Sequence, residues 1–176
     1  MRVPPLPGDR WGEEEDAALA GMLPRRLRNP EGAGNALGTL IRHPELTKAF
    51  LGLNVHLLFG STLPPRLREL AILRIAKRRD CSYEWLHHVL VAAQEGMTEA
   101  EIEAAGEGRA DGELELAVIR AVDELDGGSN LSDPTWAELS EHLDERQRMD
   151  LIFTIGTYIT LSIAFNALGV RPEHER

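Results

Sequence analysis

Four side chains between residues 69 and 88 have the types and the spacing for acid–base or thiol chemistry. They form the pattern Glu-x11-Cys-x2-Glu-x3-His, which consists of Glu69, Cys81, Glu84 and His88. At about 100° per residue, the last three side chains fall within roughly 60° of one another on a helix. Glu69 lies in the apolar run RELAILRIAK, at the spacing of that helix's apolar face. If two adjacent helices bring the four together, two carboxylates, a thiol and an imidazole converge on one patch.

These residue types allow two chemistries and one structural role. His88 can move a proton near neutral pH, where an imidazole titrates, and a thiolate at Cys81 can act as a nucleophile. Burial of Glu69 would raise its pKa unless a partner compensates. The structural alternative is a surface ion pair between Glu84 and His88, with a cysteine that is a small buried hydrophobe. The spacing alone leaves both interpretations open, because structural networks also perturb titratable groups.

The elements that must position this pattern are helices. Prolines, glycines and capping residues predict an all-α fold of about eight helices, and no segment alternates with period two. Residues 29–32 are expected to form a turn, and Asp80 is expected to cap the helix that carries the cluster. Thr98 opens a further helix with a Thr-x-x-Glu capping box. The other expected helices lie at about 13–23, 33–42, 44–59, 64–78, 112–126, 133–143 and 145–168.

Length and composition indicate one domain, residues 1–176, with 43% apolar and 27% charged residues. The net charge of −10 argues against nucleic acid or an anionic membrane surface as the main partner. A single cysteine excludes an intrachain disulfide, and the N-terminal residues lack an apolar signal-peptide region, so a cytoplasmic location is expected. The longest apolar stretch, 151–170, is interrupted by Thr, Tyr, Ser and Asn. It is expected to be a buried C-terminal helix and not a membrane span.

Residues 63–106 resemble the core of the carboxymuconolactone decarboxylase family, which includes the alkylhydroperoxidase D-like proteins. The resemblance rests on the Arg-Glu-Leu beginning, the string Cys-Ser-Tyr-Glu-Trp-Leu-His-His and the string Gly-Met-Thr-Glu-Ala-Glu-Ile. Residues 35–46 are compatible with a longer member, so the family core is expected at about 35–106, with C-terminal helices over 107–170. The resemblance implies an alkylhydroperoxidase D-like helical bundle. It also implies a homo-oligomer, a trimer or hexamer with a dimer as a further option, and a site in a pocket near an interface.

The chain combines features of two branches of that family. The peroxidase branch is marked by Glu-x11-Cys-x2-Cys-x3-His, in which the two cysteines cycle between dithiol and disulfide. Glu69, Cys81 and His88 match this pattern, but Glu84 replaces the second cysteine, so a dithiol cycle cannot run within one chain. The decarboxylase branch pairs a glutamate with a histidine four residues later, which Glu84 and His88 supply.

Three hypotheses follow. In the first, which we favour slightly, the cluster performs acid–base chemistry on a small organic acid or lactone, with His88, Glu84 and Glu69 as acids and bases and Cys81 lining the pocket. In the second, Cys81 attacks a hydroperoxide and an external thiol completes the cycle. In the third, the protein is a non-catalytic oligomeric scaffold in which the cluster is a structural polar network.

No metal and no cofactor are predicted. His87 and His88 lie side by side and cannot easily face one ion, and no glycine-rich phosphate loop follows a strand. His87 is treated as secondary because it points roughly 100° away from His88. His56 is expected to be a satisfied core histidine, and Trp85 a packing or interface residue rather than a substrate platform.

Overall fold

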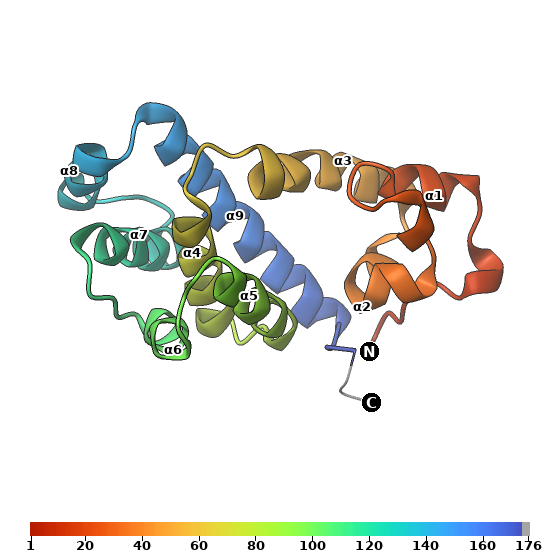
Figure 1. Ribbon diagram of the computed structural model, residues 1–176. Coiled ribbons are helices and arrows are strands. Elements are labelled where there is room, and N and C mark those ends of the chain that lie inside the picture. The colour runs from red at the N-terminus through yellow and green to blue at the C-terminus, as the bar shows by residue number, and fades with distance from the viewer. Residues whose placement is uncertain (174–176) are drawn as a thin grey trace. The chain divides into compact units, whose positions relative to one another are not determined.

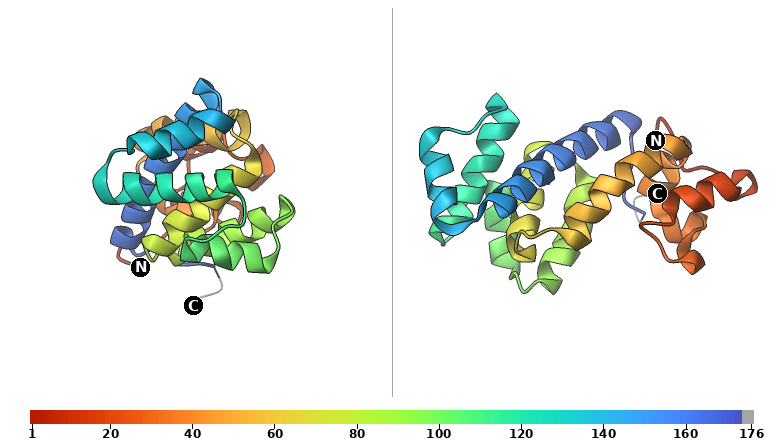
Figure 2. Two further views of the ribbon diagram at one scale, coloured as in Figure 1. Left: turned by 90° about the vertical axis from the view of Figure 1, so that its left-hand side faces the viewer. Right: turned by 90° about the horizontal axis from the view of Figure 1, so that it is seen from above.

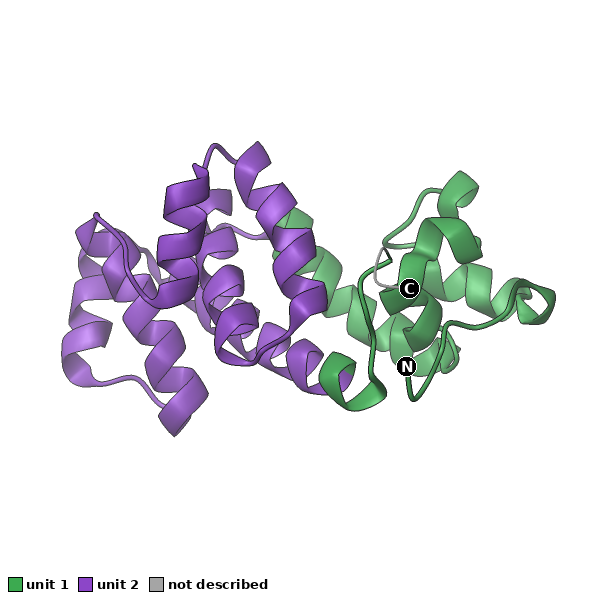
Figure 3. Ribbon diagram, turned by 90° about the horizontal axis from the view of Figure 1, so that it is seen from below, with its two compact units in different colours: residues 1–60, 165–176 green, residues 61–164 purple. Residues whose placement is uncertain are grey.

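The computed structural model describes residues 1–173, and in this range the chain is entirely helical. It contains nine α-helices, three single helical turns of other types and no strand. The predicted all-α class is therefore confirmed. The chain divides into two compact units (Figure 3). Unit 1 consists of residues 1–60 and the segment from Phe165 onward, and unit 2 consists of residues 61–164.

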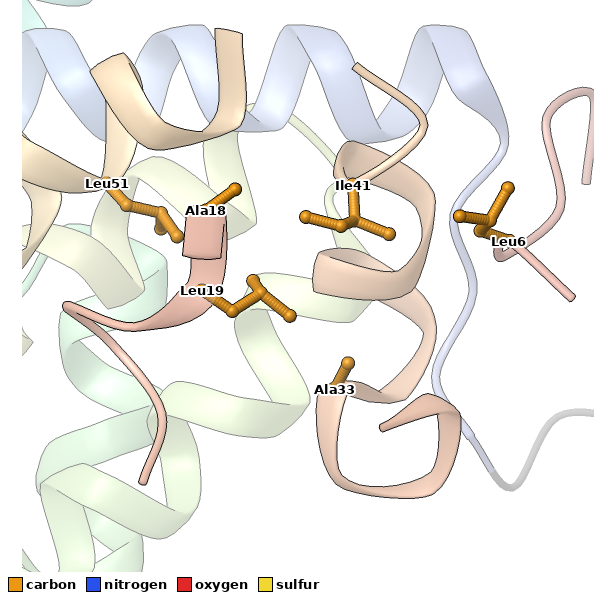
Figure 4. Close-up of a cluster of buried hydrophobic side chains, with 6 residues drawn as sticks. All are labelled: Leu6, Ala18, Leu19, Ala33, Ile41 and Leu51. Carbon is orange, nitrogen blue, oxygen red and sulfur yellow. The ribbon is translucent and has the colours of Figure 1, made fainter. Parts of the chain in front are cut away.

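Unit 1 is built around a small apolar core. Its α-helices are α1 (Glu13–Leu19), α2 (Pro30–Leu40) and α3 (Pro44–Val55), and the short turns are η1 (Gly8–Arg10), η2 (Arg25–Leu27) and the π-helical η3 (His56–Gly60). The core side chains, drawn in Figure 4, are Leu6, Ala18, Leu19, Ala33, Ile41 and Leu51. Each is at most 5% exposed, so α1, α2 and α3 all contribute to the same buried cluster.

Two predicted boundaries in unit 1 were wrong, and a third element has a different helix type at its end. Residues 29–32 are not a free turn but the beginning of α2, because Asn29 Oδ1 accepts a hydrogen bond from the Gly32 N–H and Pro30 occupies the first helical position. The helix expected at 13–23 ends at Leu19, where tighter turn hydrogen bonds begin. The segment expected to be helical at 44–59 is helical throughout, as α3 up to Val55 and as the π-helical turn η3 from there on.

Unit 2 is organised around its first helix. It contains α4 (Pro65–Arg78), α5 (Ser82–Gln94), α6 (Glu99–Glu107), α7 (Glu113–Gly128), α8 (Asp133–His142) and most of α9 (Glu145–Leu168). Helix α4 contacts α5, α6 and α7 (Figures 1 and 2). Its residues from Leu67 to Leu73 are all buried, so it is covered on nearly every side. A helix with this much burial usually carries apolar residues all round. The charged residues inside α4 therefore need a specific explanation.

The junction between α4 and α5 fixes the position of Cys81. The Cys81 N–H donates to the Ala76 carbonyl and the Asp80 N–H donates to the Lys77 carbonyl, which is the hydrogen-bond pattern of a Schellman motif. Asp80 has a left-handed backbone with φ of 49°, a conformation that a short polar side chain tolerates. The predicted cap at Asp80 was therefore wrong, since Asp80 ends α4 and Cys81 is the N-cap residue of α5.

Helix α9 combines a buried and an exposed face. Leu151 and Ile155 are fully buried, whereas Phe153 and Ile163 are each 53% exposed. Within residues 1–173, α9 is the one helix long and apolar enough to cross a membrane, with a mean hydropathy of 1.7 over a window that is 44% buried. Length and composition alone are weak evidence for a span, because the core helix of a soluble protein passes the same test.

Candidate active site

The site begins with two adjacent charged residues inside α4. Glu69 is 0% exposed and Arg68 is 7% exposed. The Arg68 Nε–H donates to Glu69 Oε1 across 2.8 Å, so the buried carboxylate has a cationic partner on its own helix. A carboxylate without such a partner would be costly to bury.

His88 links this pair to α5. Its Nδ1 lies 2.6 Å from Glu69 Oε2, and its Nε2 lies 3.3 Å from Glu84 Oε2, one helical turn earlier in α5. Glu84 is 5% exposed and His88 7% exposed. One imidazole therefore bridges two buried carboxylates that come from two different helices.

The electrostatics of this arrangement keep His88 charged. Burial by itself would lower the pKa of His88, but the hydrogen bonds to Glu69 and Glu84 and the negative charges of both carboxylates raise it to about 9. At neutral pH the imidazole is therefore protonated and donates from both nitrogens. Arg68 and His88 then supply two positive charges against the two negative charges of Glu69 and Glu84. This neutral sum explains how the group can be buried.

Cys81 lies at the N-terminus of α5 and is 1% exposed. Burial raises the pKa of its thiol, and the charge of Glu84 also raises it. The backbone N–H groups of Glu84 and Tyr83 and the hydroxyl of Ser162 act in the opposite direction, because they point toward the sulfur and favour its thiolate form. Because burial is the largest effect, the resting residue is a neutral thiol at pH 7.

Two further residues reach the cluster from α9. The Tyr158 ring meets the His88 ring edge-on, with centroids 5.0 Å apart and an interplanar angle of 86°. Ser162 lies one turn later in α9, is 0% exposed and acts on the Cys81 thiol. The sequence signal that could have identified Tyr158 and Ser162 as site residues is their spacing of four within an otherwise apolar helix.

The structure thus brings three of the four predicted residues, Glu69, Glu84 and His88, into direct contact. Cys81 lies at the same end of α5 and interacts electrostatically with Glu84. Their catalytic roles stay predictions. All the charged side chains of the cluster are nearly covered, since those of His88, Arg68 and Glu84 are 10%, 9% and 6% exposed.

The secondary residues have other surroundings. The ring of His87 contacts the ring of Tyr83, with centroids 4.3 Å apart and an interplanar angle of 32°. Trp85 packs against the backbone of Gly106 and beneath the Lys77 ammonium group, a packing role. His56 is exposed in η3, so its predicted place in a core was wrong. Among residues 1–173, no three or more His, Cys, Asp or Glu residues form a metal-binding group.

Comparison with known proteins identifies similar sequences and folds. The model of the carboxymuconolactone decarboxylase family matches residues 44–124. The alkylhydroperoxidase AhpD core structure of a peroxidase-related protein from Ralstonia eutropha JMP134 has a TM-score of 0.75 and 16% identity, covering 98% of this chain and 94% of that chain. No curated protein matches the sequence.

A dehalogenating enzyme has the same fold. The debrominase Bmp8 in its apo form has a TM-score of 0.75 and 21% identity, covering 98% of this chain and 92% of that chain. A cysteine-to-alanine variant of Bmp8 in complex with 2,3,4-tribromopyrrole has a TM-score of 0.73 and 19% identity, covering 99% and 92%. At these identities the similarity establishes the fold and not the reaction.

Proposed function

Because this chain belongs to the carboxymuconolactone decarboxylase and alkylhydroperoxidase D-like superfamily, we propose that it is an enzyme that transfers protons on a small carboxylated organic acid or lactone. The observation that carries the proposal is the placement of His88 between Glu69 and Glu84. This arrangement produces a buried imidazolium that is still protonated at neutral pH. Such a group is a general acid rather than a general base.

The direction of proton transfer restricts the reaction. With a pKa of about 9, His88 starts protonated and can give its proton to a carbanion or enolate. In a decarboxylation, the carbon–carbon bond to the carboxylate breaks, CO₂ leaves, and the electron pair stays on carbon, delocalised onto a neighbouring carbonyl oxygen. His88 then protonates that carbon. One proton is consumed for each CO₂ released, and solvent returns it to the imidazole.

The two carboxylates have different roles in this scheme. Glu69 makes the shorter contact with the ring and is itself held by Arg68. It therefore orients the imidazole and stabilises its charge. The contact between Glu84 and Nε2 is longer than the contact between Glu69 and Nδ1, and Glu84 is slightly exposed. The proton that can be transferred is therefore the one on Nε2. Glu84 can guide the returning proton from solvent to the ring.

A second candidate is a thiol-dependent hydroperoxidase with Cys81 as nucleophile. One observation favours it, namely the position of Cys81 at the start of α5, where nearby N–H groups lower the pKa of the thiol. The thiolate would attack one peroxide oxygen, the O–O bond would break, and an alcohol would leave. An external thiol would then reduce the sulfenate through a mixed disulfide. Burial of Cys81, which raises the pKa of its thiol, weighs against this candidate.

Turnover by matched variants separates these candidates. Purified protein is assayed with γ-carboxymuconolactone, with an organic hydroperoxide plus dithiothreitol, and with 2,3,4-tribromopyrrole plus the same dithiol. The variants are His88→Gln, Glu84→Gln and Cys81→Ser, with His87→Gln as the control for a neighbouring histidine. Lactone turnover that is lost in His88→Gln and Glu84→Gln but kept in Cys81→Ser supports proton transfer. Peroxide or bromopyrrole turnover that is lost in Cys81→Ser supports thiol chemistry.

The third hypothesis, a structural scaffold, is an outcome of the same experiment. Absence of turnover on every substrate, together with loss of assembly in Glu69→Gln, would replace the enzymatic proposal with the structural one.

We also propose that the protein is a cytoplasmic homo-oligomer, a trimer or hexamer with a dimer as the alternative. The exposed apolar side chains Leu90 (64%) and Phe153 (53%) support burial against other subunits. Light scattering coupled to gel filtration measures the oligomeric state.

A further inference from the structure

Two residues of α9 that carry hydroxyl groups, Tyr158 and Ser162, are buried beside the cluster. Tyr158 is 2% exposed, and its hydroxyl makes no hydrogen bond to any residue in the range 1–173. Ser162 is 0% exposed, and its Oγ also lacks a hydrogen-bond partner. The two residues are four positions apart on one helix, so both hydroxyls lie on the same side of α9. Tyr158 contacts His88, and Ser162 acts on Cys81.

Such groups are costly unless something binds them. A buried hydroxyl without a partner destabilises the fold, and native proteins keep few of them. The polar groups nearest to these hydroxyls are already engaged, because Glu69 is bound by Arg68 and His88, and His88 is bound by both glutamates. The two O–H groups are therefore left to donate to a molecule that enters the site.

We propose that Tyr158 and Ser162 bind the substrate oxygen on which negative charge develops, the carbonyl oxygen of a lactone or carboxylic acid. This inference rests on the proposed proton-transfer function and assigns two more catalytic residues to the same site. Donors that are fixed before the reaction stabilise a developing oxyanion most effectively in a buried site.

The surroundings of Tyr158 suit this role. Burial and the charges of Glu84 and Glu69 keep the pKa of the Tyr158 phenol well above its usual value, and Arg68 only partly opposes them. The phenol therefore stays a neutral donor and does not lose its proton to the substrate. As CO₂ leaves, the electron pair moves onto the carbonyl oxygen, which accepts hydrogen bonds from Tyr158 and Ser162. His88 then protonates the carbon, and neither hydroxyl changes its protonation state.

Turnover kinetics give the first test. Tyr158→Phe is expected to lower kcat on γ-carboxymuconolactone by about 100-fold, the effect of removing one oxyanion donor, with little change in KM. Ser162→Ala is expected to lower kcat in the same direction. The controls are Tyr83→Phe, which removes a phenol that contacts His87, and Thr154→Val, which removes another buried hydroxyl without a partner. Both controls should keep the kcat of the natural sequence.

A binding probe tests the inference independently of turnover. The probe is 4-nitrophenol, whose phenolate carries an anionic oxygen and absorbs visible light. The protein is expected to bind the phenolate, and Tyr158→Phe and Ser162→Ala should each weaken binding by at least about tenfold, the order of one hydrogen bond to a charged group. Tyr83→Phe and Thr154→Val should bind the phenolate with unchanged affinity.

The two measurements distinguish failure of the inference from failure of the proposed function. Phenolate binding that depends on Tyr158 and Ser162 without any lactone turnover would support the oxyanion site and reject decarboxylation. Lactone turnover that depends on His88 but is unchanged in Tyr158→Phe and Ser162→Ala would overturn the inference and leave the function standing. Absence of both turnover and phenolate binding would overturn both.

Discussion

His88 Nδ1 lies 2.6 Å from Glu69 Oε2, although the two residues are 19 positions apart and belong to α5 and α4. The contact is buried, since Glu69 is 0% exposed and His88 7% exposed. It connects the two helices by a charge-assisted hydrogen bond, which is stronger than a neutral one. The protonation of His88 and the folding of unit 2 are therefore coupled.

The first prediction concerns the pH dependence of stability. The pKa of His88 is about 9 in the folded state, against 6.5 as its ordinary value. Between these values the folded state keeps a proton that the unfolded state has lost. The contribution of His88 is thus fully present below pH 6.5 and is lost as the pH rises through 9. Urea unfolding should show a fall of about 3 kcal/mol in the free energy of unfolding over this range.

Two variants serve as comparisons for this pH profile. His88→Gln removes the titrating group and should flatten the profile between pH 6.5 and 9 relative to the natural sequence. His43→Gln removes an exposed histidine near Glu45 and should leave the profile unchanged. A natural protein whose stability is constant over this range would contradict the assignment of a buried imidazolium.

The second prediction ranks the two carboxylates by their effect on the pKa of His88. Glu69→Gln removes the closer partner and Glu84→Gln the more distant one, so both should lower the pKa and Glu69→Gln should lower it more. Nuclear magnetic resonance of the imidazole nitrogens measures this pKa directly. An equal effect of both variants, or a larger one for Glu84→Gln, would show that the 2.6 Å contact is not the main cause of the shift.

Glu69→Gln should also destabilise the fold. It leaves the buried Arg68 without its carboxylate, and breaking a buried ion pair from one side typically costs about 3–5 kcal/mol. The matched control is Glu107→Gln, which removes a carboxylate from an exposed pair with Arg109 and should have no measurable effect on unfolding.

The third prediction concerns the reactivity of Cys81. The thiol is 1% exposed and its pKa is raised by burial, so iodoacetamide should modify the folded protein far more slowly than the same protein in denaturing urea. The unfolded chain is an internal control, because Cys81 is its single thiol. Rapid modification of the folded protein at pH 7 would indicate an accessible thiolate and would favour the peroxidase candidate.

The sequence predicted the site correctly where the relationship lies within a single helix. Spacing along α5 correctly related Glu84 to His88, because residues four apart on a helix are neighbours. The apolar spacing around Glu69 correctly indicated that its carboxylate is buried. These are local relationships, and a helical period is enough to predict them.

The contacts that the sequence did not predict join distant segments. Tyr158 is 70 positions from His88, and no local period indicates which face of α9 packs against α5. Asp80 resembled a helix cap because aspartate is common at that position. Its left-handed backbone instead ends α4, and this follows from how sharply the chain must turn before α5.

The fourth prediction tests the packing that positions α5. A Cβ on Gly106 of α6 would lie 2.8 Å from the Trp85 ring, so Gly106→Ala should force the indole to move and destabilise the protein by about 1–3 kcal/mol. Gly156→Ala is the matched control, because the same methyl group there would meet nothing within 4 Å and should stabilise α9 by about 0.5–1 kcal/mol. Thermal unfolding of both variants measures the difference.

Because Trp85 lies on α5 one residue after Glu84, displacement of the indole should also weaken the Glu84–His88 contact. Gly106→Ala should therefore lower the pKa of His88 as well, whereas an unchanged pKa would show that the contact tolerates movement of α5.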